Sequence, residues 1–343
     1  MASMETSPPP ERRAFTSPPT PAKLTVVSEA APLVATDLAP APDGGAAEWF
    51  RGADGARLRA ALFPAKGKVK GSVVLSPGRT EPLDKYFEVI GELQARGFVV
   101  LAHDWRGQGL SARMLPDPLK GHAAGSAPFL SDVRALLGHF ETRLPRPWVK
   151  VGHSMGGCLS LLMLARGEAR FSACALSAPM LGIVTRGHGY PLARTLGWAM
   201  AHLGQGKQYL FRHPNDPLTL TFEGEKLAHD RARWDRWRSQ LEARPEIGLG
   251  NLTWGWLEFA FSTTAWLRRS KAVEAIDIPV LIVAAGQDDR VLTAETARLA
   301  ARLPNARYVE IPHAWHEILM ETDDIRAIWG REFDTLTASI GRA

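Results

Sequence analysis

Residues 152–157, Gly-His-Ser-Met-Gly-Gly, constrain the fold of this chain more than any other part of the sequence. They lie between an apolar run at residues 148–151 and a helix-like stretch at residues 158–166. This is a strand-to-helix junction in which a serine has a glycine two residues before it and another two residues after it. A serine in this setting occupies a sharp, strained turn that raises its hydroxyl above a sheet. The turn also directs the Met155 amide and the start of the helix toward the place where an oxyanion would form. Ser154 is therefore a candidate nucleophile, and the Met155 N–H is a candidate oxyanion donor.

Strand-like and helix-like segments alternate along most of the sequence. Apolar and β-branched runs predict strands at residues 49–51, 56–63, 71–75, 97–102, 148–151, 172–176, 280–285 and 307–311. Helical spacing of apolar residues predicts helices at residues 86–95, 128–144, 158–166, 294–303 and 324–340. Strands separated by helices of this length indicate an α/β fold, with a mostly parallel central sheet covered by helices on both faces.

The alternation stops between residues 183 and 272. Helix-like periods prevail there, and six of the 11 tryptophans fall in this stretch. We expect an inserted helical cap at residues 183–272, between a first part of the core at residues 47–182 and a second part at residues 273–343. Residues 1–46 are rich in Pro, Ala, Ser and Thr, a composition that predicts a disordered extension.

The formal net charge of +5 is concentrated in the predicted cap. Residues 183–272 contain 13 Lys and Arg against 8 Asp and Glu, a difference of +5, so the rest of the chain is balanced. This basic segment either contacts an anionic membrane surface or an anionic substrate, or it is a solvated helical face. No nucleic-acid-binding motif accompanies the charge, so a nucleic-acid partner is not expected.

The cysteines and the hydropathy of the chain bear on its location. Cys158 and Cys174 both fall in core-like apolar stretches, which favours free thiols in a reducing compartment. No apolar run is long enough to cross a bilayer, and residues 1–21 lack the apolar centre of a secretory signal. We expect a cytoplasmic protein, with peripheral association with a membrane as an option.

A serine nucleophile requires a histidine base and an acid that orients this base, and after an elbow of this type they follow in the order acid, histidine. Ligands gather at the carboxyl ends of parallel strands, so each partner should come directly after a strand. His313 and His316 both follow the strand at residues 307–311. His316, a few residues further along, is placed where a loop can hold it over the elbow, and it is the candidate base. His153, next to the nucleophile, is expected to be a packing residue.

Two adjacent carboxylates are candidates for the acid that orients the histidine. Asp288 and Asp289 both follow the strand at residues 280–285, within the sequence Gly-Gln-Asp-Asp-Arg. Either of them can orient His316, while the other caps the helix that begins near Thr293. The residues alone leave both assignments open.

The second oxyanion donor is expected from the loop after the strand at residues 71–75. This loop reads Ser-Pro-Gly-Arg-Thr-Glu over residues 76–81. Gly78 permits an unusual backbone turn, which would face the Arg79 amide toward the elbow. The side chain of Arg79 is either solvated or pairs with Glu81 or with a phosphate.

Four motifs together resemble the α/β-hydrolases of the monoacylglycerol lipase and lysophospholipase type. They are the elbow at residues 152–157, Asp-x-Arg-Gly-x-Gly-x-Ser at residues 104–111, the acid loop at residues 286–290 and the histidine loop at residues 314–317. The resemblance runs from about residue 48 to the C-terminus and implies the α/β-hydrolase fold. In that group the catalytic aspartate precedes an arginine, so the resemblance favours Asp289.

The loop that follows the strand at residues 71–75 favours one branch of that group. Monoacylglycerol lipases usually carry His-Gly there, followed by a further Gly and His, whereas this chain has Pro77, Thr80 and Pro82 at those positions. Residues 77–79, Pro-Gly-Arg, are similar to the corresponding loop of bacterial lysophospholipases.

The resemblance implies a serine hydrolase that cleaves the carboxylic ester of a long-chain acyl lipid through an acyl-enzyme, with a lysophospholipid as the first candidate substrate. Monoacylglycerol lipase, general carboxylesterase and acyltransferase activities use the same three groups and stay open. A binding protein without activity is the remote alternative, and the intact set of Ser154, Asp289 and His316 argues against it.

The aromatic residues of the predicted cap have two interpretations. Trp254, Trp256 and Phe259 either line a pocket for an acyl chain or build the core of the cap itself. No cofactor or metal is implied, because the histidines are scattered along the sequence and the two cysteines lie in core-like runs.

Overall fold

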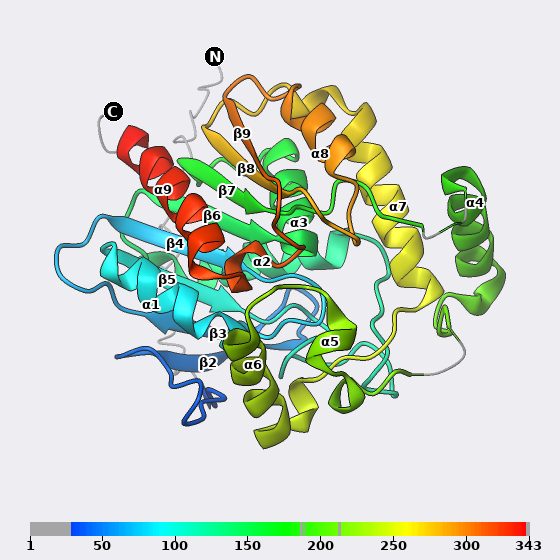
Figure 1. Cartoon of the computed structure of the whole chain (residues 1–343), viewed down its shortest axis with the longest axis horizontal. Coiled ribbons are helices and arrows are strands. Elements are labelled where there is room, and N and C mark those ends of the chain that lie inside the picture. Colours follow the sequence, from blue (N-terminus) through cyan, green and yellow to red (C-terminus); the bar gives the residue numbers. More distant parts are fainter. Residues whose placement is uncertain (1–28, 186, 188, 212–213, 341–343) are drawn as a thin grey trace, which may run out of the picture.

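The computed structural model describes residues 29–185, 187, 189–211 and 214–340 of the chain. Nine strands of this part form one sheet, in the order β1-β2-β3-β5-β4-β6-β7-β8-β9 (Figure 1). Their bounds are β1 Glu29–Ala31, β2 Ala46–Arg51, β3 Arg57–Phe63, β4 Gly71–Ser76, β5 Phe98–His103, β6 Trp148–His153, β7 Ala173–Ser177, β8 Val280–Ala285 and β9 Ala306–Ile311. In this order the pairs from β5 to β9 are parallel, and those that join β1, β2, β3 and β5 are antiparallel. The mostly parallel central sheet predicted from the sequence is confirmed.

Helices cover both faces of this sheet (Figure 1). One face carries α1 (Phe87–Ala95) and α9 (Asp323–Ile340), and the other carries α2 (Ala127–Phe140), α3 (Ser154–Ala165) and α8 (Thr293–Ala300). Short 3₁₀ helices lie at η1 (Leu83–Tyr86), η2 (Glu141–Arg143) and η7 (Ile318–Met320).

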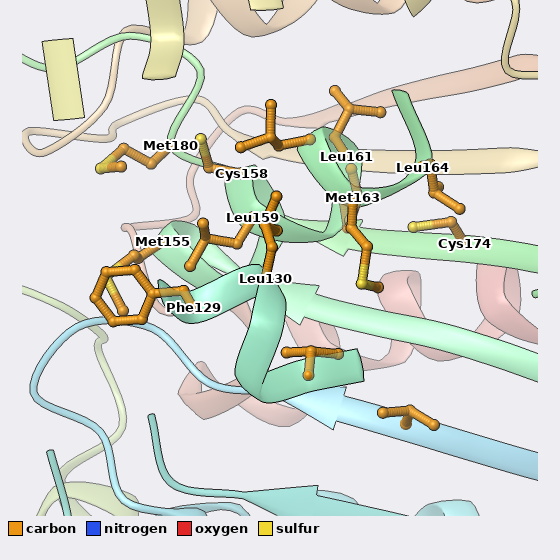
Figure 2. Packing of buried hydrophobic residues seen from close by; sticks show 14 of the residues in the cluster. Phe129, Leu130, Met155, Cys158, Leu159, Leu161, Met163, Leu164, Cys174 and Met180 are labelled. Atoms are coloured by element: carbon orange, nitrogen blue, oxygen red, sulfur yellow. The ribbon is translucent and has the colours of Figure 1, made fainter. Parts of the chain in front are cut away.

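The central strands β4 to β8 are buried along their whole length, because helices pack on both of their sides. Alternate residues of a strand point to opposite faces. In β4, Val74 packs in the apolar cluster with α2 and α3, whereas Val73 and Leu75 pack in the cluster with α1 and α9. Figure 2 shows the first cluster, in which side chains of α3 lie beside Phe129 and Leu130 of α2. This packing holds the elbow firmly at the start of α3.

The segment between β7 and β8 is helical, and its described residues form no strand. It contains α4 (Tyr190–Met200), α5 (Phe222–Glu225), α6 (Arg231–Ala243) and α7 (Trp254–Arg269), together with a π-helical turn at η3 (Ala201–Gln205) and 3₁₀ helices at η4 (Pro217–Thr219), η5 (Pro245–Ile247) and η6 (Lys271–Val273). These helices lie where an inserted cap is predicted, and the division of the chain into a cap and two core parts stays a prediction. No helix in the described part of the chain is long and apolar enough to cross a bilayer.

The prediction that residues 1–46 are disordered is wrong for residues 29–46. β1 pairs with β2 in an antiparallel manner, and Val34 is buried, with its N–H donating to Asp84 Oδ1 at 2.8 Å. Ala39 is also buried. The composition rich in Pro and Ala did not indicate this attachment, because one edge strand and two buried side chains are enough to hold such a segment on the core. Residues 1–28 lie outside the described residues.

Candidate active site

Ser154 lies at the junction between β6 and α3, in a strained backbone conformation with φ of 49°. The two glycines on either side of it are required by close backbone contacts. A Cβ on Gly152 would lie 2.8 Å from both Gly156 O and Ser160 Oγ, and a Cβ on Gly156 would overlap the carbonyl oxygens of Ser76 and Pro77. A left-handed φ at a residue with a side chain is unfavourable and is retained where the surrounding structure enforces it. The elbow predicted from the sequence is therefore present.

His316 connects Ser154 to a carboxylate. The Nε2 atom of His316 lies 2.9 Å from Ser154 Oγ, and its Nδ1 atom lies 2.7 Å from Asp288 Oδ2. Asp288 Oδ1 accepts hydrogen bonds from the N–H groups of Arg290 and Val291, at 2.8 and 3.0 Å. Burial raises the pKa of Asp288, but the hydrogen bond and charge of His316 outweigh this effect, and the net pKa is below its usual range. The carboxylate is therefore held ionised next to the imidazole.

The prediction of Asp289 as the orienting acid is wrong. The side chain of Asp289 is 48% exposed and forms an ion pair with Arg290 Nε at 3.1 Å. The acid loop is fixed to the histidine loop by backbone hydrogen bonds from Gly286 N to Ile311 O and from Gln287 N to Ala314 O. These bonds set the position of the turn, and in this position Asp288 faces His316. A pattern that places an aspartate before an arginine contains no information about the direction in which either carboxylate points.

The loop after β4 is held by its own Glu81 and by Gln108 from the loop after β5. Gly78 N–H donates to Glu81 Oε2 at 2.6 Å, and Gly78 O accepts from Gln108 Nε2 at 3.1 Å. Thr80, which has φ of 68°, donates its N–H to Gln108 Oε1 at 2.9 Å. The Arg79 N–H, between these anchored groups, has no hydrogen-bond acceptor among the described residues. This backbone amide is therefore available to a ligand, as the sequence predicts for an oxyanion donor.

The sequence contains no signal that Gln108 and Glu81 shape this loop. Gln108 occupies a variable position of the motif at residues 104–111, and the motif contains no information about the contacts of that position. Asp104 in the same motif accepts hydrogen bonds from Leu83 N and Leu110 N, so it organises its own turn. The partner of Gln108 is set by tertiary structure.

A buried ion pair joins the loop after β4 to the histidine loop. Lys85 Nζ lies 3.1 Å from Glu81 Oε1 and 2.6 Å from Glu317 Oε1, and all three side chains are buried. Burial raises the pKa of Glu81, but the charges of Lys85 and His153 and a hydrogen bond from Tyr86 lower it to about 2. Glu81 is therefore ionised at neutral pH and stabilises the loop that carries Arg79.

His153 and His313 lie where packing and loop residues are expected. His153 is buried, and its Nδ1 atom lies 3.0 Å from Ser177 O. Burial lowers the pKa of His153 to about 4, so its ring is neutral at physiological pH. His313 is exposed. His316 is thus the histidine that the structure brings to Ser154.

The three predicted substrate-binding aromatic residues have different surroundings. Trp256 lines an opening of about 210 Å³, which includes solvent at its mouth, together with Met155, Phe129 and other residues. Phe259 is fully buried and packs with its ring 5.3 Å from that of Phe129, within the main apolar cluster. Trp254 is partly exposed and is not among the residues that line this opening. Figure 2 shows Phe129 and Met155 side by side at this position. Of the three, only Trp256 lines this opening together with Met155.

Among the residues that the structure describes, no group of three or more His, Cys, Asp and Glu side chains is arranged to hold a metal ion.

Known proteins resemble this chain over most of its length. Residues 67–323 match the protein family described as serine aminopeptidase, S33. The chain belongs to the serine aminopeptidase S33 family. Lysophospholipase L2 of Escherichia coli (strain K12) is 32% identical over 298 residues, which cover 81% of this chain and 83% of the relative. A monoacylglycerol lipase of Mycolicibacterium smegmatis is 32% identical over 131 residues, or 38% of this chain and 45% of the relative.

Solved structures of family-like proteins support the fold. A soluble variant of monoglyceride lipase from Saccharomyces cerevisiae superposes with a TM-score of 0.68 at 19% identity, covering 84% of this chain and 93% of the other. A carboxyl esterase from Bacillus coagulans gives a TM-score of 0.67 at 18% identity, covering 87% and 99%. The protein therefore has the α/β-hydrolase fold, as predicted. Its family and the activities of the relatives named above show that it is an enzyme of the ester hydrolase class.

Proposed function

We propose that the protein is a lysophospholipase that cleaves the carboxylic ester of a long-chain lysophospholipid. The observation that carries the proposal of a serine mechanism is the chain of contacts from Ser154 Oγ through His316 to Asp288, at 2.9 and 2.7 Å. The substrate class rests on the match to lysophospholipase L2, which spans more than four-fifths of both chains.

The proposed reaction begins when His316 Nε2 takes the hydroxyl proton of Ser154 as Oγ attacks the ester carbonyl carbon. Asp288 accepts the Nδ1–H hydrogen bond and stabilises the imidazolium that forms. The Met155 and Arg79 amides bind the tetrahedral oxyanion, and each such donor is typically worth about 3–4 kcal/mol of transition-state stabilisation. His316 then gives its proton to the leaving alcohol. Water hydrolyses the acyl-enzyme with the same base.

Monoacylglycerol hydrolysis is the second candidate. It is supported by partial matches to monoacylglycerol lipases, which cover 38% of this chain, and by the yeast monoglyceride lipase structure. The loop at residues 77–79 favours the first candidate, because it lacks the His-Gly of that branch. Carboxylesterase and acyltransferase activities use the same groups and are outcomes of the test below.

The proposal includes contact between α4 and the lipid surface that supplies the substrate. Leu192, Leu196, Trp198 and Leu203 of α4 and η3 are 47–73% exposed. α4 packs through its buried Gly197 against Leu257 and Phe261 of α7. An exposed apolar helix face of this kind suits the surface of a lipid aggregate. A cytoplasmic location stays a prediction.

The test is fatty-acid release from four palmitoyl or short-chain substrates by the wild type and Ser154→Ala. The substrates are lysophosphatidylethanolamine, lysophosphatidylcholine, 1-palmitoylglycerol and p-nitrophenyl butyrate. We expect lysophospholipid turnover well above that of the short ester, and its loss in the variant. Preference for 1-palmitoylglycerol would select the second candidate, and turnover of the short ester alone would remove the lipid assignment. Acyl transfer to added glycerol, read in the same assay, would indicate a transferase.

A further inference from the structure

The guanidinium of Arg79 lies in a cradle formed by two loops and an aromatic ring. Its Nη2 atom donates to Gly250 O, and its Cζ atom lies 5.5 Å from the centroid of the Trp256 ring. A Cβ on Gly121 would come within 2.5 Å of Nη2, so the guanidinium lies directly on the bare backbone of Gly121. The Nε–H is buried and has no hydrogen-bond partner among the described residues. The residue as a whole is partly exposed, so a ligand can reach the rest of the group.

Two other buried arginines of this protein, Arg59 and Arg106, differ from Arg79 in their partners. Arg59 is fully buried and contacts the carboxylates of Asp84 and Asp104, the latter at 2.7 Å. Arg106 contacts Asp132 at 2.6 Å and Asp54 at 2.8 Å. A buried charge is costly unless it is paired, and these carboxylates supply the pairing.

Arg79 has no carboxylate within ion-pair distance in the part of the chain that the structure describes. Burial, together with the like charge of Arg290, lowers the pKa of Arg79 to about 10. The side chain is therefore still protonated at neutral pH. Its charge lacks a counter-ion in the protein, and an anion from outside would supply one.

The position of the Arg79 guanidinium links it to the proposed reaction site. Arg79 itself presents the backbone amide proposed to bind the oxyanion, and Trp256, under its guanidinium, lines the opening beside Met155. The unpaired charge is thus one side chain's length from the place of the scissile carbonyl. In a lysophospholipid, the glycerol carbons join the ester to a phosphate over a similar length.

We propose that the Arg79 side chain binds the phosphate of the substrate's head group and thereby selects phosphate-bearing esters over neutral acylglycerols. Guanidinium N–H groups form paired hydrogen bonds with phosphate oxygens, and such charge-assisted bonds are strong. The bond to Gly250 O leaves other N–H groups of Arg79 for this purpose. This inference rests on the proposed lysophospholipase function and names the group by which that function would recognise its substrate.

The first experiment compares kcat/KM for palmitoyl lysophosphatidylglycerol and 1-palmitoylglycerol, both dispersed in the same neutral detergent. The variants are Arg79→Met and Arg79→Lys, and the control is Arg269→Met, which removes an exposed arginine at the end of α7. We expect Arg79→Met to lower the ratio of lysophospholipid to acylglycerol turnover at least tenfold, and Arg79→Lys to retain part of it. The control keeps the ratio of the wild type. An equal loss on both substrates would overturn the inference, because it would mean that the side chain only positions the loop.

The second experiment measures binding without a lysophospholipid substrate. Glycerol 3-phosphate, inorganic phosphate and glycerol are compared as inhibitors of p-nitrophenyl butyrate hydrolysis, after thermal melting has shown that each variant is folded. We expect glycerol 3-phosphate to inhibit competitively and its Ki to rise about tenfold in Arg79→Met. Inhibition by inorganic phosphate of equal strength would overturn the head-group assignment in favour of a free phosphate. No change in Ki would overturn the site itself.

These two experiments separate this inference from the proposed function. If the wild type cleaves acylglycerol but no lysophospholipid, the proposed function fails, and the Ki of glycerol 3-phosphate still decides whether Arg79 binds phosphate. If the wild type cleaves both lipids and Arg79→Met leaves the ratio and the Ki unchanged, only the inference fails.

Discussion

Two regions of the molecule differ in the way their side chains are partnered. The first, which we call the catalytic edge because it carries the proposed catalytic residues, consists of the loops after β4, β5, β6, β8 and β9. There, buried side chains such as Gln108, Glu81 and Lys85 hold the backbone by hydrogen bonds and ion pairs. The second is α4 with η3, where Leu192, Leu196, Trp198 and Leu203 are exposed.

The difference suits the two tasks that we propose for these regions. Stabilising a transition state requires donors that are fixed before the substrate arrives, and a buried network of satisfied polar groups provides this. Contact with a lipid aggregate requires exposed apolar area on an element that tolerates different lipid arrangements. The four predictions below test this comparison, from the largest expected effect to the smallest.

The largest effect is expected from the acid at the catalytic edge. Asp288→Asn should lower kcat by about 10⁴-fold, because the amide no longer orients and stabilises the imidazolium of His316. The matched control is Asp289→Asn, one residue away and exposed, which should remain within about threefold of the wild type. Steady-state kinetics on p-nitrophenyl butyrate measures both. A larger loss in Asp289→Asn than in Asp288→Asn would reverse the assignment.

Stability at the catalytic edge should depend on pH through Glu81. Its folded-state pKa of about 2 lies below its ordinary value of 4.5, so its contribution is fully present above pH 4.5 and is lost as the pH falls toward 2. Glu81→Gln should therefore lower the free energy of unfolding at pH 7 by up to about 3 kcal/mol, and by less as the pH is lowered from 5 to 3.

Urea denaturation at several pH values checks this prediction for Glu81. The control is Glu242→Gln, which removes an exposed carboxylate paired with Arg238 and should change the free energy of unfolding by less than about 0.5 kcal/mol. A difference between the wild type and Glu81→Gln that stays constant with pH would contradict a depressed pKa for Glu81.

A substitution on the exposed face of α4 should affect hydrolysis at lipid surfaces only. Leu196→Glu should reduce hydrolysis of lysophospholipid in anionic vesicles by roughly tenfold, because a carboxylate opposes both apolar insertion and the negative surface. Hydrolysis of soluble p-nitrophenyl butyrate should be unaffected. Val69→Glu makes the same change at another exposed apolar side chain, before β4, and serves as the control. Equal losses in the two variants would remove α4 from the proposal.

The smallest effect is expected at Trp256 of α7, the helix against which α4 packs. Trp256→Ala should change the relative turnover of palmitoyl and butyroyl esters by roughly threefold to fivefold, because the ring lines the opening beside Met155. Trp254→Ala, outside that opening, should leave the chain-length profile as in the wild type. If both variants give that same profile, the acyl chain lies elsewhere.

The sequence predicted the elements that depend on local patterns. Apolar runs located the strands from β2 to β9, and helical spacing located α1, α2, α3, α8 and α9, with end points that differ by a few residues. β1 was not predicted, because Glu29–Ala31 is short and lies in a segment rich in Pro and Ala. The role of Phe259 also depended on packing, since an aromatic residue in a helix suits a core as well as a pocket.

By itself, the sequence determined the elbow at Ser154, the choice of His316 and the fold that brings their loops to one edge of the sheet. These follow from the steric demands of glycines around a strained residue and from the order of strands and helices along the chain. Tertiary structure alone decided that Asp288 and not Asp289 faces His316, that Gln108 holds the loop after β4, and that the Arg79 side chain lies against Gly250 and Trp256. The physical reason is that each of these contacts joins residues far apart in the sequence, so it is set by the packing of loops against one another and not by local conformational preference.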